Sequence, residues 1–274
     1  RELELSALLQ SAFDTATGSG PLASAVDDAG VEYTLACLSD PDPVARIHAF
    51  LGERPCVIAD GHHRYETALE YRRQQRAAAG DVVVDAPFES TLAYFANAYA
   101  PGSLLLPIHR VIREVAAPDA DAWLERLPGW RCESVAGADI ESVAALLEQH
   151  LAPLTDRAAF AADDGSGVLR IFSRDEPLGD ALMVRVIEED VIGRVFGLST
   201  EAIREGAVSF PKSAARAARE VREGQGTVAL YLNALSPDDV FRVTGEGEVM
   251  PQKSTFFYPK VPTGMVFRVH EPSE

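Results

Sequence analysis

Residues 55–80 constrain the fold most strongly, because the sequence changes character abruptly at one dipeptide. Residues 55–59 (PCVIA) are typical of a short buried strand, and Asp60-Gly61 is a turn dipeptide. About 15 good helix formers follow, and they end at Gly80. The segment therefore predicts a strand, a tight turn and a helix, in that order.

Other segments repeat this mixture of helix and strand. Apolar spacing and end signals predict helices at residues 2–15, 43–51, 119–127, 139–151, 184–196 and 212–223, and a short helix after Ser236-Pro237. Short apolar runs predict strands at residues 31–38, 91–98, 104–106, 157–162, 167–173 and 227–232. The strands at 157–162 and 167–173 are joined by a turn-rich stretch, which indicates a hairpin. We therefore expect a mixed α+β fold.

Composition limits the class of protein. The 274 residues are 47% hydrophobic and 24% charged, which is typical of an ordinary globular chain. We expect one unit over residues 1–274, with a candidate subdomain seam near residues 152–156. The three cysteines have no paired spacing, and no apolar stretch reaches the roughly 20 residues that span a bilayer, so we expect a cytoplasmic protein without a membrane partner. A net charge of −17 argues against nucleic acid as a partner.

The densest group of chemically active residues is the Asp60 loop, defined here as residues 60–64 (DGHHR). The N-terminus of a helix leaves backbone N–H groups free and favours an anion, and the side chains of His62, His63 and Arg64 add donors. Gly61 allows positive φ or a close approach to a ligand. Asp60 can accept a proton, hold a metal or merely cap the helix. The alternative reading makes Asp60 a cap and the other three solvated first-turn residues.

The helix after this loop carries further charges. Glu66 and Glu70 lie one turn apart, and we interpret them as helix-surface partners of Arg73 rather than as catalytic acids.

A second group lies near the C-terminus. Residues 251–270 contain no Asp or Glu but include Lys253, Lys260 and Arg268, which makes the segment basic within an acidic chain. This local charge indicates an anionic ligand, for which Lys253, Ser254 and Thr255 offer an ammonium and two hydroxyls. The aromatic residues at 256–258 either pack beneath a base or, as we favour, join the core.

Two more basic groups are ambiguous. His109 and Arg110 follow an apolar run and lie near a strand end, which suits a functional or a structural pair equally. Lys212, Arg216, Arg219 and Arg222 recur at helical spacing, and we interpret them as a solvated helix face, with a docking surface as the alternative.

Three motifs together resemble a known family. They are residues 58–69 (IADGHHRYETAL), 106–110 (LPIHR) and 253–264 (KSTFFYPKVPTG). In this order they resemble the domain-of-unknown-function family 1015, and the resemblance spans nearly the whole chain. Members of that family begin further upstream, so we expect an N-terminal segment, which would carry site residues of its own, to be missing here.

The DGHHR element resembles the phosphate-binding loop of the ParB and sulfiredoxin-like superfamily, and in particular a short element of free-serine kinases. The resemblance implies that Gly61, His62, His63 and Arg64 hold a phosphate, with Asp60, His62 and His63 as catalytic residues. The remaining candidates are Lys253, Ser254 and Thr255 for phosphate or nucleotide, and His109, Arg110, Tyr258 and Lys260 for substrate. A nucleoside phosphate, ATP or ADP, and Mg²⁺ would be the cofactors.

Three functions follow, in order of preference. The first is a nucleotide-dependent phosphotransferase that acts on a small hydroxyl metabolite such as free serine. The second is a regulatory protein that binds a nucleotide or phosphorylated metabolite without turnover. The third is a metal-assisted hydrolase with Asp60, His62 and His63 as ligands. ParB-like DNA binding ranks below these, because the chain is acidic and its basic stretches are short. Each leading reading has a small molecule as partner and leaves the oligomeric state open.

Overall fold

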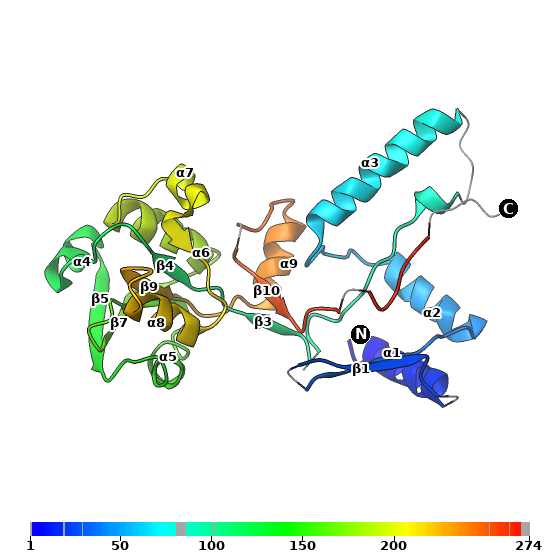
Figure 1. Ribbon diagram of the computed structural model, residues 1–274, viewed down its shortest axis with the longest axis horizontal. Coiled ribbons are helices and arrows are strands. Elements are labelled where there is room, and N and C mark those ends of the chain that lie inside the picture. The colour runs from blue at the N-terminus through cyan, green and yellow to red at the C-terminus, as the bar shows by residue number, and fades with distance from the viewer. Residues whose placement is uncertain are drawn as a thin grey trace. The chain divides into compact units, whose positions relative to one another are not determined.

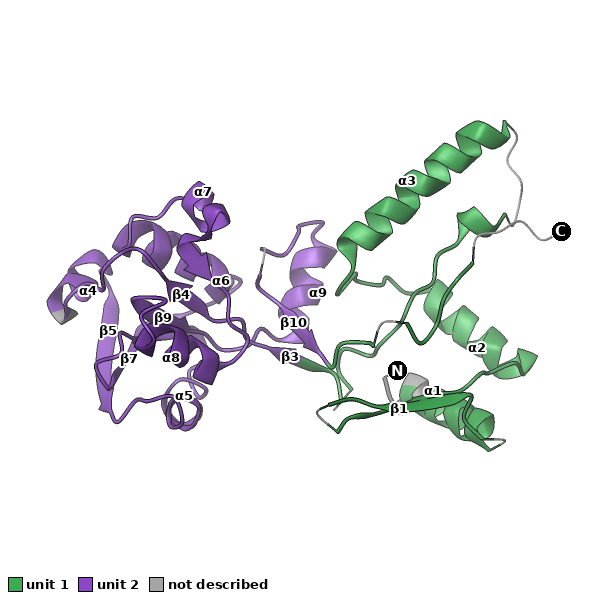
Figure 2. Cartoon of the chain, in the orientation of Figure 1, with its two compact units in different colours: residues 1–104, 259–274 green, residues 105–258 purple. Residues whose placement is uncertain are grey.

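The protein folds into two compact units of mixed α and β structure. The computed structural model describes residues 2–18, 20–28, 30–80, 86–100, 102–251, 253–262 and 264–269 (Figure 1). Unit 1 comprises residues 1–104 and 259–274, and unit 2 comprises residues 105–258 (Figure 2). Residues 152–156, where we expected a subdomain seam, lie inside unit 2. Among the described residues, no helix has the length and apolar character needed to cross a membrane.

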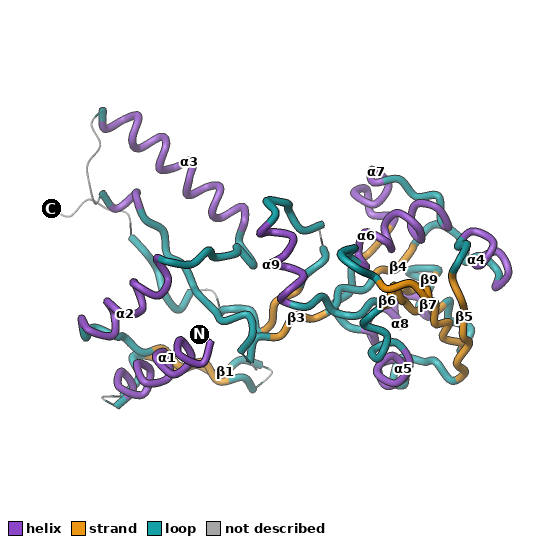
Figure 3. Tube along the Cα trace, turned by 180° about the vertical axis from the view of Figure 1, so that it is seen from behind, coloured by secondary structure: helices purple, strands orange, loops and turns teal. Residues whose placement is uncertain are grey.

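Unit 2 is built on a six-stranded sheet (Figure 3). The strand order is β5-β7-β6-β9-β4-β8, and each neighbouring pair is antiparallel. The strands are β4 (Arg110–Ile112), β5 (Trp130–Ala136), β6 (Arg157–Asp163), β7 (Val168–Pro177), β8 (Val208–Ser209) and β9 (Val228–Tyr231). Two shorter strands, β3 (Leu104–Leu106) and β10 (Phe256–Tyr258), pair with each other in a separate sheet.

Both faces of the six-stranded sheet are buried. Successive side chains of a strand point to opposite faces, and along β6 Phe160 belongs to one apolar cluster while Ala159 and Ala161 belong to another. Along β9, Leu230 and Tyr231 divide in the same way. The sheet therefore forms the middle layer of unit 2.

Helices cover the two faces. The cluster around Phe160 includes residues of α4 (Ala120–Arg126), α6 (Met183–Val186) and the π-helical η2 (Ile187–Val195). The opposite cluster includes residues of α5 (Val143–His150) and α8 (Ala214–Arg222). The remaining helices of unit 2 are α7 (Thr200–Ala202), η3 (Ile203–Ala207) and α9 (Pro237–Gly245).

Two local predictions in unit 2 are confirmed in detail. β6 and β7 form the expected hairpin, and the Asp163 carboxylate accepts a hydrogen bond from the Gly165 N–H at 2.9 Å in its turn. Ser236 caps α9 in a capping box with Asp239, and Pro237 is the first helical residue.

Unit 1 consists of three helices, a two-stranded sheet and a 3₁₀ turn among the described residues. They are α1 (Glu2–Thr17), the antiparallel pair β1 (Ala23–Val26) and β2 (Glu32–Leu35), α2 (Pro41–Gly52), α3 (His62–Ala79) and the 3₁₀ turn η1 (Pro87–Glu89). α3 begins and ends where the sequence predicts, between Gly61 and Gly80. The predicted strand at residues 31–38 is shorter, since only its first half pairs.

Two predicted strands of unit 1 are wrong. Residues 55–59 and 91–98 are not strands and have no strand partner among the described residues. Residues 55–59 are also mostly exposed rather than buried, with Ile58 at 39%. A strand needs a neighbour to accept its hydrogen bonds, and β propensity alone does not supply one.

Candidate functional site

The Asp60 loop enters α3 through a left-handed glycine. Gly61 has φ 84° and ψ 28° and is the N-cap residue, and no side chain of the described residues caps the helix. A Cβ atom at this position would lie 2.9 Å from Nη2 of Arg64. The loop therefore needs glycine both for its backbone angle and for the space that the Arg64 guanidinium occupies.

Asp60 lies between two cations of unit 1. Its Oδ2 atom is 3.4 Å from Arg64 Nη2 and 3.4 Å from Lys260 Nζ. The side chains are 60% (Asp60), 78% (Arg64) and 43% (Lys260) exposed, so all three reach solvent. The alternative role of Asp60 as the helix cap is wrong, because Gly61 takes that position and the carboxylate turns to the cations.

The first turn of α3 has an unusual charge pattern. Helix N-termini favour acids, yet α3 begins with His62, His63 and Arg64 and has no acid in its first turn. His63 lies 3.4 Å from Glu66, between its Nδ1 atom and a carboxylate oxygen, and its side chain is fully exposed. This arrangement leaves basic side chains beside the positive end of the helix dipole, which an anion would offset.

The predicted ion pairs of α3 are confirmed in one case. Glu70 pairs with Arg73 at 2.9 Å, as expected. Glu66 instead faces His63, because residues three apart on a helix are neighbours.

A second group of predicted site residues lies in unit 2. His109 and Arg110 are 4% and 1% exposed, at the start of β4. Burial, reinforced by the neighbouring Arg110 charge, lowers the pKa of His109 to about 4. Burial also lowers the pKa of Arg110 to about 10, while the carboxylate of Glu188 opposes that shift.

Arg110 holds the segment that follows α9. Its guanidinium donates to the backbone oxygens of Ile108 and of Lys253, the latter at 3.2 Å. Lys253 has φ 58°, a left-handed angle that a non-glycine residue adopts at a cost. The buried Ser254 hydroxyl donates to the Pro251 oxygen at 2.6 Å, so it serves the backbone of this turn.

The aromatic residues after this turn are not core residues. Phe256 and Phe257 are half-buried, Tyr258 is 41% exposed, and none of them belongs to either apolar cluster. Our preference for a core role is therefore wrong. Thr255 is half-buried and precedes β10.

The basic stretch 212–222 does not form one solvated face. Arg222 donates to the fully buried Asp163 at 2.8 Å and to the Ala138 oxygen at 2.6 Å. Lys212 lies over the ring of Phe256, with its Nζ atom 4.2 Å from the ring centre. Lys212, Arg216 and Arg219 are exposed, as a solvated face predicts, so helical spacing misjudged Arg222.

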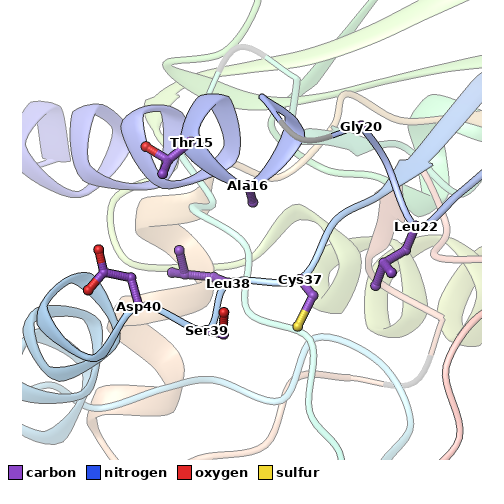
Figure 4. Close-up of a pocket in the computed structure, with 8 residues that line it drawn as sticks. All are labelled: Thr15, Ala16, Gly20, Leu22, Cys37, Leu38, Ser39 and Asp40. Carbon is purple, nitrogen blue, oxygen red and sulfur yellow. The ribbon is translucent and has the colours of Figure 1, made fainter.

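A pocket of about 390 Å³ lies elsewhere in unit 1 (Figure 4). The described residues that line it are Thr15, Ala16, Gly20, Leu22, Cys37, Leu38, Ser39 and Asp40. None of them belongs to the Asp60 loop or was a predicted site residue. No sequence signal pointed to this pocket, because its lining combines the end of α1 with loop residues at 20–22 and 37–40.

The described residues contain no group of three or more His, Cys, Asp and Glu that could hold a metal ion. Asp60 is the carboxylate of the Asp60 loop, and His63 is directed to Glu66. The ligand set expected for a metal-assisted hydrolase is therefore not assembled in the described part of the chain.

The predicted site residues thus form two groups. In unit 1 the structure brings Asp60, Arg64 and Lys260 together, next to His62 and His63. In unit 2 it brings His109 and Arg110 together with the turn at residues 253–255. The protein therefore has a mixed α+β fold and two candidate sites, one in each unit, that are rich in basic side chains.

Comparison with known proteins identifies the family. The family described as "Protein of unknown function (DUF1015)" matches residues 2–162, and the chain belongs to this family. The match contains the first two of the three motifs. None of the curated proteins matches the chain.

The solved structures that resemble the chain are distant from it. One is a conserved hypothetical protein from Pyrococcus furiosus, 15% identical, covering 92% of this chain and 83% of that chain with a TM-score of 0.36. Another is a free serine kinase in complex with AMP, 15% identical, covering 91% of this chain and 79% of that chain with a TM-score of 0.35.

Proposed function

We propose that the protein is a nucleotide-dependent phosphotransferase whose Asp60 loop binds a phosphate group of ATP or ADP. The acceptor is a small hydroxyl metabolite, with free serine as the first candidate. The observation that carries the proposal is the placement of Asp60 between Arg64 and Lys260, directly before a helix N-terminus that no side chain of the described residues caps.

The charge pattern supports phosphate binding. The first N–H groups of a helix have no partner within the helix, and the dipole there favours negative charge. The side chains of His62, His63 and Arg64 add further donors, of which Arg64 is permanently charged. A phosphate would satisfy these N–H groups and offset cations that a helix N-terminus otherwise disfavours.

Asp60 supplies the other half of the chemistry. Phosphoryl transfer depends on positioning and on neutralising charge, and a carboxylate near the phosphate can accept the proton of the attacking hydroxyl. Arg64 and Lys260 hold the Asp60 carboxylate by ion pairs, and their positive charges would also neutralise charge on the phosphate. Asp60 also fits Mg²⁺, which is commonly bound by one or two carboxylates together with phosphate oxygens and would supply further charge neutralisation.

The first test measures binding. Arg64→Gln should weaken ADP binding about ten-fold or more, because a hydrogen bond to a charged group contributes about 1.5–3 kcal/mol. Arg73→Gln is the matched control, since Arg73 is an exposed arginine of the same helix that pairs with Glu70. Isothermal titration calorimetry with ADP reports both. Equal affinity in the two variants would remove the Asp60 loop from the phosphate site.

The second test separates transfer from binding. Asp60→Asn should abolish transfer from ATP or ADP to serine or another small alcohol while it preserves nucleotide affinity, since asparagine accepts no proton at neutral pH. Nucleotide binding by the natural protein with no transfer to any hydroxyl acceptor would favour the regulatory function instead.

A further inference from the structure

Lysine is rare in this chain. The sequence has 25 basic residues of the Lys and Arg types, and Lys212, Lys253 and Lys260 are its three lysines. Lys253 and Lys260 flank β10, and Lys212 lies against Phe256 within β10. Lys253 and Lys260 are therefore close to β10 in sequence, and Lys212 contacts β10 although it is distant from it in sequence.

The residues just before Lys212 contact the start of β4. Lys212 follows Phe210 and Pro211, which continue from the end of β8. The Pro211 oxygen accepts a hydrogen bond from the His109 N–H at 2.9 Å. The Arg110 guanidinium lies 5.6 Å from the centre of the Phe210 ring. The start of β4 therefore fixes the chain that carries Lys212.

The same strand fixes Lys253. Arg110 donates to the Lys253 oxygen at 3.2 Å, so one buried guanidinium contacts both the Phe210 ring and the Lys253 turn. Lys253 keeps a left-handed backbone there and has an exposed side chain. Arg110 thereby joins the two segments that present Lys212 and Lys253.

The two lysines of this group have no close acidic partner. Within the described part of the chain, no carboxylate lies within 4.0 Å of Lys212 or Lys253, whereas the charge of Glu188 acts on Arg110. The Nε atom of the buried Arg110 also has no hydrogen-bond partner among the described residues. Lys212 and Lys253 thus place two exposed cations without a close acid around one short segment, and such a local positive patch attracts an anion.

We infer that Lys212 and Lys253 form an anion-binding site on unit 2, with Arg110 as the positioning residue. The ligand is a phosphate-bearing molecule, and this choice of ligand class rests on the proposed function. The Phe256 ring orients the Lys212 ammonium by a cation–π contact. Arg110 and Ser254 maintain the turn, because the Arg110 Nη atoms and the Ser254 hydroxyl donate to backbone oxygens.

The scarcity of lysine gives a direct test. Brief acetylation with a lysine-selective reagent, followed by mass spectrometry, measures the reactivity of each of the three lysines separately. Saturating ADP or pyrophosphate should protect Lys212 and Lys253 about ten-fold, and sodium sulfate at the same ionic strength should not. Protection of neither lysine, or of only one of the two, would overturn the inference.

Lys260 distinguishes this inference from the proposed function. Protection of Lys260 alone would support the Asp60 loop as the phosphate site and overturn the site on unit 2. Protection of Lys212 and Lys253 without Lys260 would support the site on unit 2 and count against the Asp60 loop.

Substitution tests the same site without chemical labelling. Lys212→Gln should weaken pyrophosphate binding about ten-fold, while Arg219→Gln, the same charge change at an exposed position of α8, should leave it within two-fold.

Arg110→Lys tests the positioning residue. It should keep the positive charge but lose the hydrogen bonds to the oxygens of Ile108 and Lys253, so it should reduce the protection of Lys253. Unchanged Lys253 protection in that variant would remove Arg110 as the positioning residue.

Discussion

Unit 1 and unit 2 differ in how they bury apolar side chains. Both apolar clusters belong to unit 2, where a sheet is covered on two faces. In unit 1 the buried apolar residues among those described are Leu8, Ala12 and Ala86, while Leu92, Tyr94 and Phe95 are more than half exposed. The hydrophobic effect scales with apolar area removed from water, so unit 2 supplies most of the folding free energy.

This difference bears on function. Binding elements tend to come from the less stable parts of a fold, where side chains are free to meet a ligand. The Asp60 loop lies in unit 1 with its charged side chains in solvent, whereas Arg110 and His109 are buried in unit 2. We therefore expect a ligand of the Asp60 loop to stabilise unit 1, because a ligand that binds only the folded form adds stability by mass action.

The largest expected effect compares one phenylalanine from each unit. Phe160→Ala removes a fully buried ring that stacks on Phe172 at 4.8 Å between centres, so it should cost about 3–5 kcal/mol. Phe95 is 52% exposed, and Phe95→Ala should change stability by less than about 1 kcal/mol. Urea unfolding followed by circular dichroism measures both. Similar losses of stability in the two variants would contradict the conclusion that the hydrophobic core lies in unit 2.

The same division explains what the sequence could predict about the fold. The ends of α3, the β6–β7 hairpin and the Ser236 cap depend on residues close in sequence, and each was predicted correctly. The expected strands at residues 55–59 and 91–98 failed, because pairing depends on a distant partner and not on local propensity.

For the same reason, the sequence could not predict which of the candidate site residues meet. Asp60 and Lys260 were both singled out, but their contact joins segments far apart in sequence. Lys212 and Arg222 share one helical spacing, yet tertiary contacts place one over Phe256 and the other against buried Asp163. Periodicity assigns a helix face but not what packs against that face.

The next effect is a pH dependence that originates in unit 2. Burial lowers the pKa of His109 to about 4, below its usual value of 6.5, so the folded state binds its proton less readily than the unfolded state does. The stabilisation is therefore complete above pH 6.5 and is lost as the pH falls toward 4, by about 3 kcal/mol. Urea unfolding of the natural protein and of His109→Gln at several pH values measures this loss. The free energy of unfolding of the variant should fall less steeply between pH 6.5 and pH 4. Parallel curves would show that His109 does not titrate in this way.

Two glycines sharpen the comparison at a smaller scale. A Cβ atom on Gly226 of unit 2 would overlap Val111 Cγ1 and lie 2.9 Å from the Ile112 oxygen, so Gly226→Ala should cost about 1–3 kcal/mol. Gly61→Ala should cost about 1–2 kcal/mol through its left-handed backbone, and it should displace the Arg64 guanidinium. Thermal unfolding reports the first loss, and ADP affinity reports the second change. Weaker ADP binding in Gly226→Ala but not in Gly61→Ala would reverse the roles assigned to the two units.

The smallest effect compares two helix caps. Ser236→Ala removes the cap and the capping box of α9 in unit 2, which should cost about 1 kcal/mol of global stability. Asp40→Ala removes the 3.2 Å bond from the Asp42 N–H that caps α2 in unit 1. Because unit 1 contributes little to the cooperative core, this loss should appear as faster amide hydrogen exchange at Asp42, Val44 and Ala45, with no change in the urea midpoint. A lower midpoint for Asp40→Ala than for Ser236→Ala would mean that unit 1 unfolds together with the core of unit 2 and shares its stability.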